Sequence, residues 1–345
     1  MAYSAIDNSS EFMNTVLWTG TNSGETISGV GFQPDLNWTK QRTGTEAHFL
    51  VDSVRGVEKT IYSDSNSAEV TESTGLTAFN SDGFVHGTDN AYCEAGNTFA
   101  SWSWKMGTTS GIDATGATIT PTAYSFNATA GQSIIKYTGT EVSATLPHGL
   151  GVVPSLIIIK DLENSNSWYV YHKSVGQGKA LRLDTQDTPD TSSTYWSDTL
   201  PTSVLFTVGT NTGVNRSGGG MIAYCFANTP GYFKTGKYTG NGNADGPFLN
   251  CNFRPSFFIL KPNSGEAWMM GDNKRANSFN PSGEYLYPNK TNAESTSTSS
   301  LTDYVSNGVK IRHAHGQFNP DGVDVYWWAF GQPIVSNSGV PCPAR

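Results

Sequence analysis

Apolar residues in this chain occur in short runs that are separated by polar turns. Two runs, residues 155–160 and 257–261, consist mostly of β-branched, aliphatic or aromatic side chains and end in lysine. Continuous apolar runs of this length are typical of strands that are buried on both faces. Residues 47–52 and 168–172 follow polar turns and resemble the next strand of a hairpin. No segment of the sequence keeps the 3.6-residue apolar period of a helix, so the pattern predicts an all-β chain.

The runs belong to four landmarks that recur in the same order three times. The first is an aromatic residue followed by Thr-Gly. The second is a proline that introduces an apolar strand and precedes a lysine by six residues. The third is a turn before an apolar residue, which in the second copy lacks its turn residues, and the fourth is a closing aromatic strand. In chain order within each copy, the landmark residues are Trp18, Pro34, Phe84 and Trp104, then Tyr137, Pro154, Phe206 and Phe226, then Tyr238, Pro255, Val309 and Phe330.

The spacing of the landmarks indicates three diverged copies of one module. Each copy spans a similar length, from 18 to 104, from 137 to 226 and from 238 to 330. Several short strands in roughly 90 residues are typical of a β-sandwich or jelly-roll-like module. We therefore expect three such modules in a row. The predicted boundaries are an N-terminal arm at 1–13, module 1 at 14–106, a Ser/Thr/Gly-rich linker or β arm at 107–132, module 2 at 133–228, module 3 at 235–331 and a tail at 332–345.

Composition narrows the class of protein. Only 14% of the residues are charged, and polarity comes instead from Ser, Thr, Asn and 37 glycines, which suit solvent-facing strands and tight turns. This is the composition of an extracellular or particle-exposed β protein. The net charge of −8 and the absence of basic runs argue against nucleic acid as a partner.

Cysteines and apolar segments bear on the compartment. Cys93, Cys225, Cys251 and Cys342 follow neither zinc spacing nor a dense disulfide framework, and Cys225 lies in an apolar run where we expect a buried free thiol. The first residues do not form a signal peptide, and no stretch approaches 18 apolar residues. We expect a chain that is made in a cytoplasm, does not insert in a membrane, and either stays in the cytoplasm or leaves its host as part of an assembly.

The same landmarks carry a family resemblance over nearly the whole chain. The matching stretches are residues 31–38, 52–56, 79–84, 146–151, 223–227, 238–242 and the ending 336–345. In these stretches the chain resembles the tail-fibre-like virion structural proteins of marine tailed bacteriophages. The resemblance implies a particle-exposed protein of a tail fibre, a head decoration or a host-contact appendage. It implies no catalysis and supplies no catalytic residue. The third copy departs most, because residues 271–275 replace the Asp-Ser-Val-Arg-Gly of 52–56, so a site built on that element need not exist there.

Residues 48–55 contain the one arrangement that suggests a catalytic triad. Asp52 stands beside Ser53, with His48 four residues upstream, but there is no Gly-x-Ser-x-Gly elbow and the stretch has the pattern of a turn after a strand. An ion pair between Asp52 and Arg55, or hydrogen bonds from Arg55 to backbone carbonyls, explains it better. We therefore assign no catalytic residue, and we expect no cofactor.

Two further sets of residues are candidates for binding. His313 and His315 would place two imidazoles on one side of a strand, where three copies around a trimer axis would complete a metal site; the alternative is exposed polar strand residues. Aromatic residues flanked by polar turns are candidates for contact with a glycan or a partner, the alternatives being core packing or contact with a neighbouring subunit. These are Trp168, Tyr195, Trp196 and Trp268.

The sequence thus predicts a structural or adhesive protein on the surface of a tailed-phage virion, as a tail fibre or other host-contact appendage. Polar loops on rigid modules would bind multivalently and without catalysis. The expected partners are other virion proteins, further copies of the chain in a homo-oligomer, for which a trimer is one arrangement, and host surface glycans. One alternative is a capsid decoration, cement or head-fibre protein. A second is a polysaccharide depolymerase, although the module period of about 100 residues differs from the short coil period of β-helical solenoids.

Overall fold

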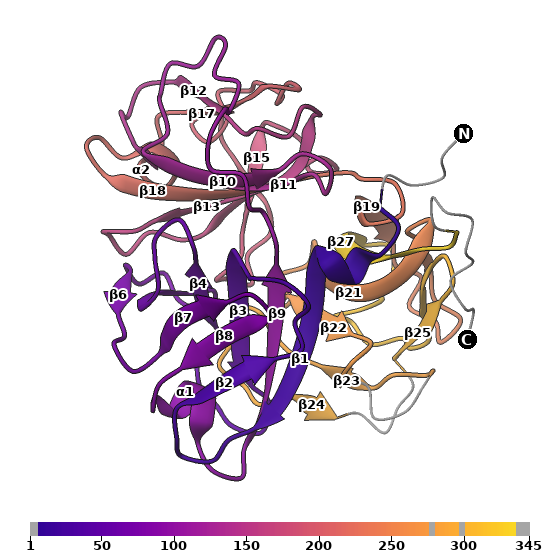
Figure 1. Ribbon diagram of the computed structural model, residues 1–345. Coiled ribbons are helices and arrows are strands. Elements are labelled where there is room, and N and C mark those ends of the chain that lie inside the picture. The colour runs from indigo at the N-terminus through magenta and orange to yellow at the C-terminus, as the bar shows by residue number, and fades with distance from the viewer. Residues whose placement is uncertain (1–5, 276–279, 297–300, 336–345) are drawn as a thin grey trace.

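The computed structural model describes residues 6–275, 280–296 and 301–335, which fold into three β modules (Figure 1). Module 1 runs from β1 (Met13–Thr19) to β9 (Thr98–Trp104), module 2 from β10 (Ala123–Asn127) to β18 (Gly220–Ala227), and module 3 from β19 (Phe233–Thr239) to β27 (Asp324–Pro333). The helices of the described residues are single turns: η1 (Ser9–Glu11), α1 (Asn90–Cys93) and α2 (Thr212–Asn215). The all-β prediction is confirmed.

Each module contains a large antiparallel sheet and a small one, and module 3 has a further two-stranded sheet. In module 1 the large sheet has the order β1-β9-β3-β4-β5-β6 and the small one β2-β8-β7. The remaining strands of module 1 are β2 (Glu25–Ser28), β3 (Leu36–Gln41), β4 (Phe49–Asp52), β5 (Lys59–Tyr62), β6 (Val70–Thr71), β7 (Leu76–Asn80) and β8 (Gly83–His86).

Modules 2 and 3 repeat this plan. Module 2 has the orders β10-β11-β18-β13-β14-β15-β16 and β12-β17, and module 3 has β19-β27-β21-β22, β20-β26-β25 and β23-β24. The strands of module 2 are β11 (Gln132–Thr138), β12 (Ala144–Pro147), β13 (Pro154–Asp161), β14 (Tyr169–His172), β15 (Lys179–Arg182), β16 (Asp190–Thr191) and β17 (Leu205–Val208). Those of module 3 are β20 (Phe248–Asn250), β21 (Phe253–Pro262), β22 (Met269–Asp272), β23 (Glu284–Tyr285), β24 (Ser295–Thr296), β25 (Thr302–Val305) and β26 (Gly308–Ile311).

The three modules close around a shared apolar core, rather than following one another in a row as we expected. One face of each large sheet packs on the module's own small sheet, and the opposite face packs on the other two modules. Rings meet across the boundaries, with centroids 5.8 Å apart for Trp104 and Phe257 and 5.5 Å for Phe226 and Phe330. The shared core includes Trp38, Trp102, Ile158, Tyr224, Ile259 and Trp328. Strands such as β3, β4 and β13 are therefore buried along their whole length.

The aromatic-Thr-Gly landmark attaches the first repeated strand of each module to a helical turn. Trp18 Nε1 donates to the carbonyl of Tyr92 (2.8 Å), Tyr137 Oη to that of Val214 (2.5 Å), and Tyr238 Oη to that of Phe318. A Cβ on the landmark glycines Gly20, Gly139 and Gly240 would lie 2.4, 2.3 and 1.9 Å from a carbonyl oxygen of the same turn. Glycine is required there because no side-chain atom fits.

Residues 107–132 contain the additional length between the first two copies. Their main element is β10, which pairs with β11 and adds a strand at the edge of the module 2 sheet. In modules 1 and 3 the corresponding sheets begin with β1 and β19, without such a strand.

No helix among the described residues is long and apolar enough to cross a membrane.

Candidate functional site

The four aromatic residues proposed for glycan contact are buried. Trp168 and Trp268 are 0% exposed, Trp196 2% and Tyr195 3%. The prediction that these rings are open to a sugar is wrong, and core packing, the alternative, is what the structure has. Trp168 Nε1 donates to the carbonyl of Tyr62 in module 1 (2.8 Å), and Trp268 Nε1 donates to that of Arg182 in module 2 (2.9 Å). The indole nitrogens of Trp168 and Trp268 thus bind a neighbouring module of the same chain.

The two histidines proposed as metal ligands do not lie on a strand. β26 ends at Ile311, so His313 and His315 belong to the following loop, and their ring centroids are 6.2 Å apart. His315 Nδ1 accepts a hydrogen bond from the backbone of Gln317 (3.2 Å). Burial, and then the nearby His313, lower the pKa of His315. No group of three or more His, Cys, Asp or Glu side chains within the described part of the chain is arranged to hold a metal ion.

A buried ion pair at the boundary of modules 1 and 2 confirms the prediction made for Asp52 and Arg55. Arg55 Nε lies 2.6 Å from Asp52 Oδ2, and its terminal nitrogens bind Glu69 (3.0 Å) and the backbone carbonyls of Leu50 and Lys59. Tyr224 of module 2 donates its hydroxyl to the same Asp52 oxygen (2.6 Å). The carboxylate therefore joins the two modules.

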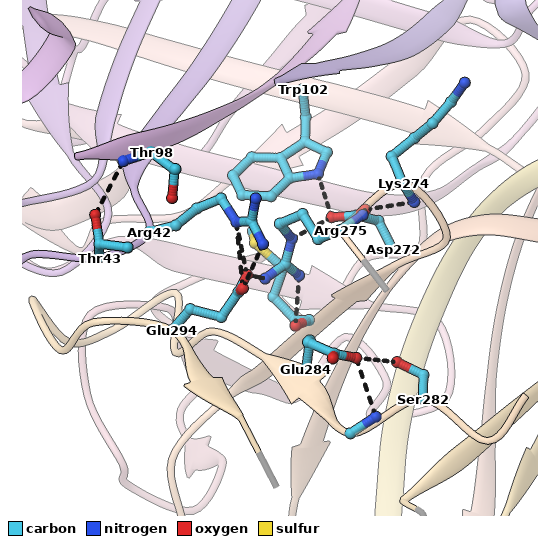
Figure 2. A network of polar contacts seen from close by, with 12 residues as sticks. Arg42, Thr43, Thr98, Trp102, Asp272, Lys274, Arg275, Ser282, Glu284 and Glu294 are labelled. Carbon is cyan, nitrogen blue, oxygen red and sulfur yellow. Dashed lines mark hydrogen bonds and ion pairs between the residues drawn. The ribbon is translucent and has the colours of Figure 1, made fainter. Parts of the chain in front are cut away.

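The same arrangement recurs between modules 3 and 1 (Figure 2). Arg275 binds Asp272 and Glu294, and Trp102 Nε1 of module 1 donates to Asp272 Oδ2 (2.9 Å). Arg42 of module 1 binds Glu294 from the other side (2.7 Å). The third copy departs from the Asp-Ser-Val-Arg-Gly sequence and therefore need not have kept this element, but it does keep it, because Asp272 and Arg275 have the three-residue spacing of Asp52 and Arg55.

Module 2 does not repeat this arrangement of aspartate, arginine and glutamate. His172 stands where the other modules have aspartate, Val175 where they have arginine, and Pro189 where they have glutamate. The position of Pro189 follows from strand pairing, because β15 pairs with β16 in the same register as β5 pairs with β6. His172 Nε2 lies 3.0 Å from the carbonyl of Trp327 in module 3. Burial lowers the pKa of His172 to about 4, so the imidazole is neutral near pH 7. Module 2 thus replaces the aspartate, the arginine and the glutamate together. A buried charge that kept no counter-charge would be strongly destabilising.

A lysine occupies the equivalent position in all three modules. Lys40, Lys160 and Lys261 are 0% exposed, and burial lowers the pKa of each to about 8. Each ammonium group binds backbone carbonyls at the end of its strand or in the loop that follows. Lys160 also reaches the carbonyl of Asn66 in module 1 (3.2 Å), and Lys261 that of Gln186 in module 2 (2.7 Å). The fixed spacing from proline marked these lysines in the sequence but did not indicate what they bind.

These contacts have a mechanical consequence. The carboxylates, guanidinium groups, indoles and ammonium groups at the module boundaries bind one another or backbone carbonyls, and most are removed from solvent. Buried polar groups in such satisfied networks hold their neighbours in one arrangement. The boundary residues therefore join three modules into one body.

The fold and these boundaries define a class: all-β proteins in which three copies of one module close around a single core. The chain belongs to the family described as a domain of unknown function (DUF7483), which matches residues 8–333. That range covers all three modules, so the family unit is the closed three-module body. No curated protein and no solved structure matches the chain.

Proposed function

We propose that the chain is a structural, adhesive component of a tailed-phage virion, placed on the particle surface as part of a tail fibre or another host-contact appendage. The observation that carries the proposal is the shared core together with the buried contacts at its boundaries. Trp168 and Trp268, which first suggested a binding site, join the buried ion pairs in uniting three modules into one body. Such a body presents the loops of three modules at once, which suits multivalent contact.

The sequence resemblance to tail-fibre-like virion proteins supports the same function. So does the low charged fraction of 14%, combined with a sequence rich in Ser, Thr, Asn and Gly. The partners in this proposal are other virion proteins and host surface glycans. Self-association is part of it too, and light scattering coupled to size exclusion measures that directly on the purified chain.

Immunogold electron microscopy of purified particles of the encoding phage tests the proposal. Antibody raised against the folded chain is compared with the same antibody pre-absorbed with purified chain. Gold on the tail tip or fibres is the expected result. Gold spread over the head would replace the appendage by a capsid decoration or cement protein. Intact particles without specific gold would overturn the virion function, and assays for polysaccharide cleavage would then come first.

A further inference from the structure

A groove of about 640 Å³ lies where module 1 meets module 2. Its walls come from four segments: residues 33–35 before β3, 53–54 after β4, 105–109 after β9, and 122–124 at the start of β10. The volume falls within the range of small-ligand pockets, about 300–1,000 Å³. The wall at β10 belongs to the additional stretch between the first two copies. The groove is therefore not a feature that every copy of the module must have.

One buried carboxylate fixes the four walls relative to one another. Asp35, 8% exposed, accepts hydrogen bonds from the hydroxyls of Ser53 (2.7 Å) and Ser125 (3.0 Å) and from the backbone of Met106 (2.8 Å). The Ser125 hydroxyl also accepts from the backbone of Gly107 (2.9 Å). The groove is therefore preorganised, which lowers the entropic cost of binding. Both oxygens of Asp35 are engaged by these neutral donors, which stabilise its negative charge without removing it.

Several side chains of the groove have unused hydrogen-bonding capacity. Gln33, Lys105 and Thr109 are exposed, and their side chains make no hydrogen bond or ion pair with any residue that the structure describes. Beside them the ring of Tyr124 is half-buried, and its hydroxyl accepts from the backbone of Ile112 (3.4 Å). An amide, an ammonium group, a hydroxyl and an aromatic ring thus line one cavity.

Module 3 has a groove of about 530 Å³, formed by residues 228–231 and 233–234 after β18, 251–253 leading into β21, and 333–335 at the end of β27. Both grooves mix polar and apolar side chains. The module 3 groove is lined by Asn228, Lys234 and Asn252 as well as by Phe233, Phe253 and Ile334.

We propose that the module 1 groove binds a short acidic saccharide. Lys105 pairs with the sugar carboxylate, Gln33 and Thr109 bind hydroxyl groups, and the Tyr124 ring packs against the apolar face of one sugar ring. This proposal rests on the adhesive function proposed above and names the class of ligand for one of its contacts.

Isothermal titration of the purified full chain tests the assignment with two probes, a tetra-uronate prepared from alginate and neutral maltotetraose. We expect binding of the tetra-uronate and at least about tenfold weaker binding of maltotetraose. Lys105→Met is expected to weaken tetra-uronate binding about tenfold, and Tyr124→Ala by a similar factor. Lys179→Met, which removes an exposed lysine of module 2 remote from the groove, is the matched control and should bind as the unmodified chain does.

Absence of tetra-uronate binding to the unmodified chain would overturn the assignment. Equal binding of both probes would overturn the role of the acidic group, and unchanged affinity in Lys105→Met would place the saccharide elsewhere. If Tyr124→Ala does not fold, as judged by its near-ultraviolet circular dichroism, the comparison of Lys105→Met with Lys179→Met decides. If gold labels the tail in the particle experiment but the chain does not bind the tetra-uronate, the inference about the groove is refuted and the proposed virion function is unaffected.

Discussion

Replacing Arg55 by methionine tests how the boundary of modules 1 and 2 is held. The substitution keeps an unbranched side chain but removes the cation from Asp52, which is 0% exposed, and from Glu69, which is 19% exposed. Removing one partner of a buried ion pair costs about 3–5 kcal/mol. We expect the lower end, about 3 kcal/mol, because Asp52 keeps its hydrogen bonds from Tyr224 and from the backbone of Val54.

The expected loss converts to a measurable shift in the thermal midpoint. Unfolding entropy is roughly 2.1 cal/mol/K per residue, so a chain of 345 residues loses about 4 °C for 3 kcal/mol. Differential scanning calorimetry gives the midpoint, and urea denaturation followed by tryptophan fluorescence gives the free energy of unfolding. Because the three modules share one core, we expect a single transition by both methods.

Two substitutions to methionine serve as controls for Arg55→Met. Val175→Met acts at the equivalent position of module 2, where no carboxylate depends on the side chain, and should cost less than about 1.5 kcal/mol. Lys237→Met removes an ion pair with Asp324 whose lysine side chain is 50% exposed, and should cost less than about 1 kcal/mol. If Arg55→Met destabilises the chain no more than these controls, the boundary ion pair does not hold the modules together and the reasoning fails.

Three further predictions concern other boundary and landmark residues. Lys261→Met should lower the free energy of unfolding by about 2–4 kcal/mol in urea, because two buried carbonyls lose their donor; an unchanged value would contradict this. Burial lowers the pKa of His172 to about 4, so between pH 6.5 and about 4 the unfolded chain binds the proton and the folded chain does not. Stability should fall as the pH drops through that window, and His172→Gln should make the fall shallower in urea titrations at about pH 7, 5.5 and 4.5. Gly240→Ala should cost about 3 kcal/mol or more, since its Cβ would lie 1.9 Å from the Pro320 carbonyl, whereas Gly316→Ala, with nothing within 4 Å, should change the midpoint by less than about 1 °C.

Local features of this fold could be predicted from the sequence because they depend on local physics. Continuous apolar runs indicated strands, and the repeated landmarks indicated three copies of one module. The spacing of Asp52 and Arg55 indicated their ion pair, since a side chain three residues away reaches back across a turn. Cys225 is a buried free thiol, as its apolar neighbours suggested.

The arrangement of the modules could not be predicted in the same way. A repeat shows that copies exist, but it does not show which faces they bring together. The one available signal was the apolar character of both faces of strands such as β13, since a two-sheet module covers only one of them. The neighbouring modules cover the other face.

The predicted binding residues failed for a related reason. Trp168 and Trp268 lie next to polar turns, a context that favours exposure, but carbonyls of another module satisfy their indole nitrogens. These partners lie 106 and 86 residues away in the sequence and leave no local pattern. The groove at Asp35 could not be predicted from the sequence either, because its four walls meet only in the folded chain.

The shared core also determines when the chain can finish folding during its synthesis. Strand β9 must pack on residues of β21 and β27, and Ser9 near the start binds the side chain of Gln332 near the end of β27 (3.0 Å). The first module therefore leaves the ribosome with one face of its large sheet uncovered. The second module covers part of that face, and the rest stays uncovered until the third module follows. A nascent chain stopped before β27 exposes a row of tryptophan and phenylalanine rings, which makes translation to the last strand the step that protects this protein from aggregation.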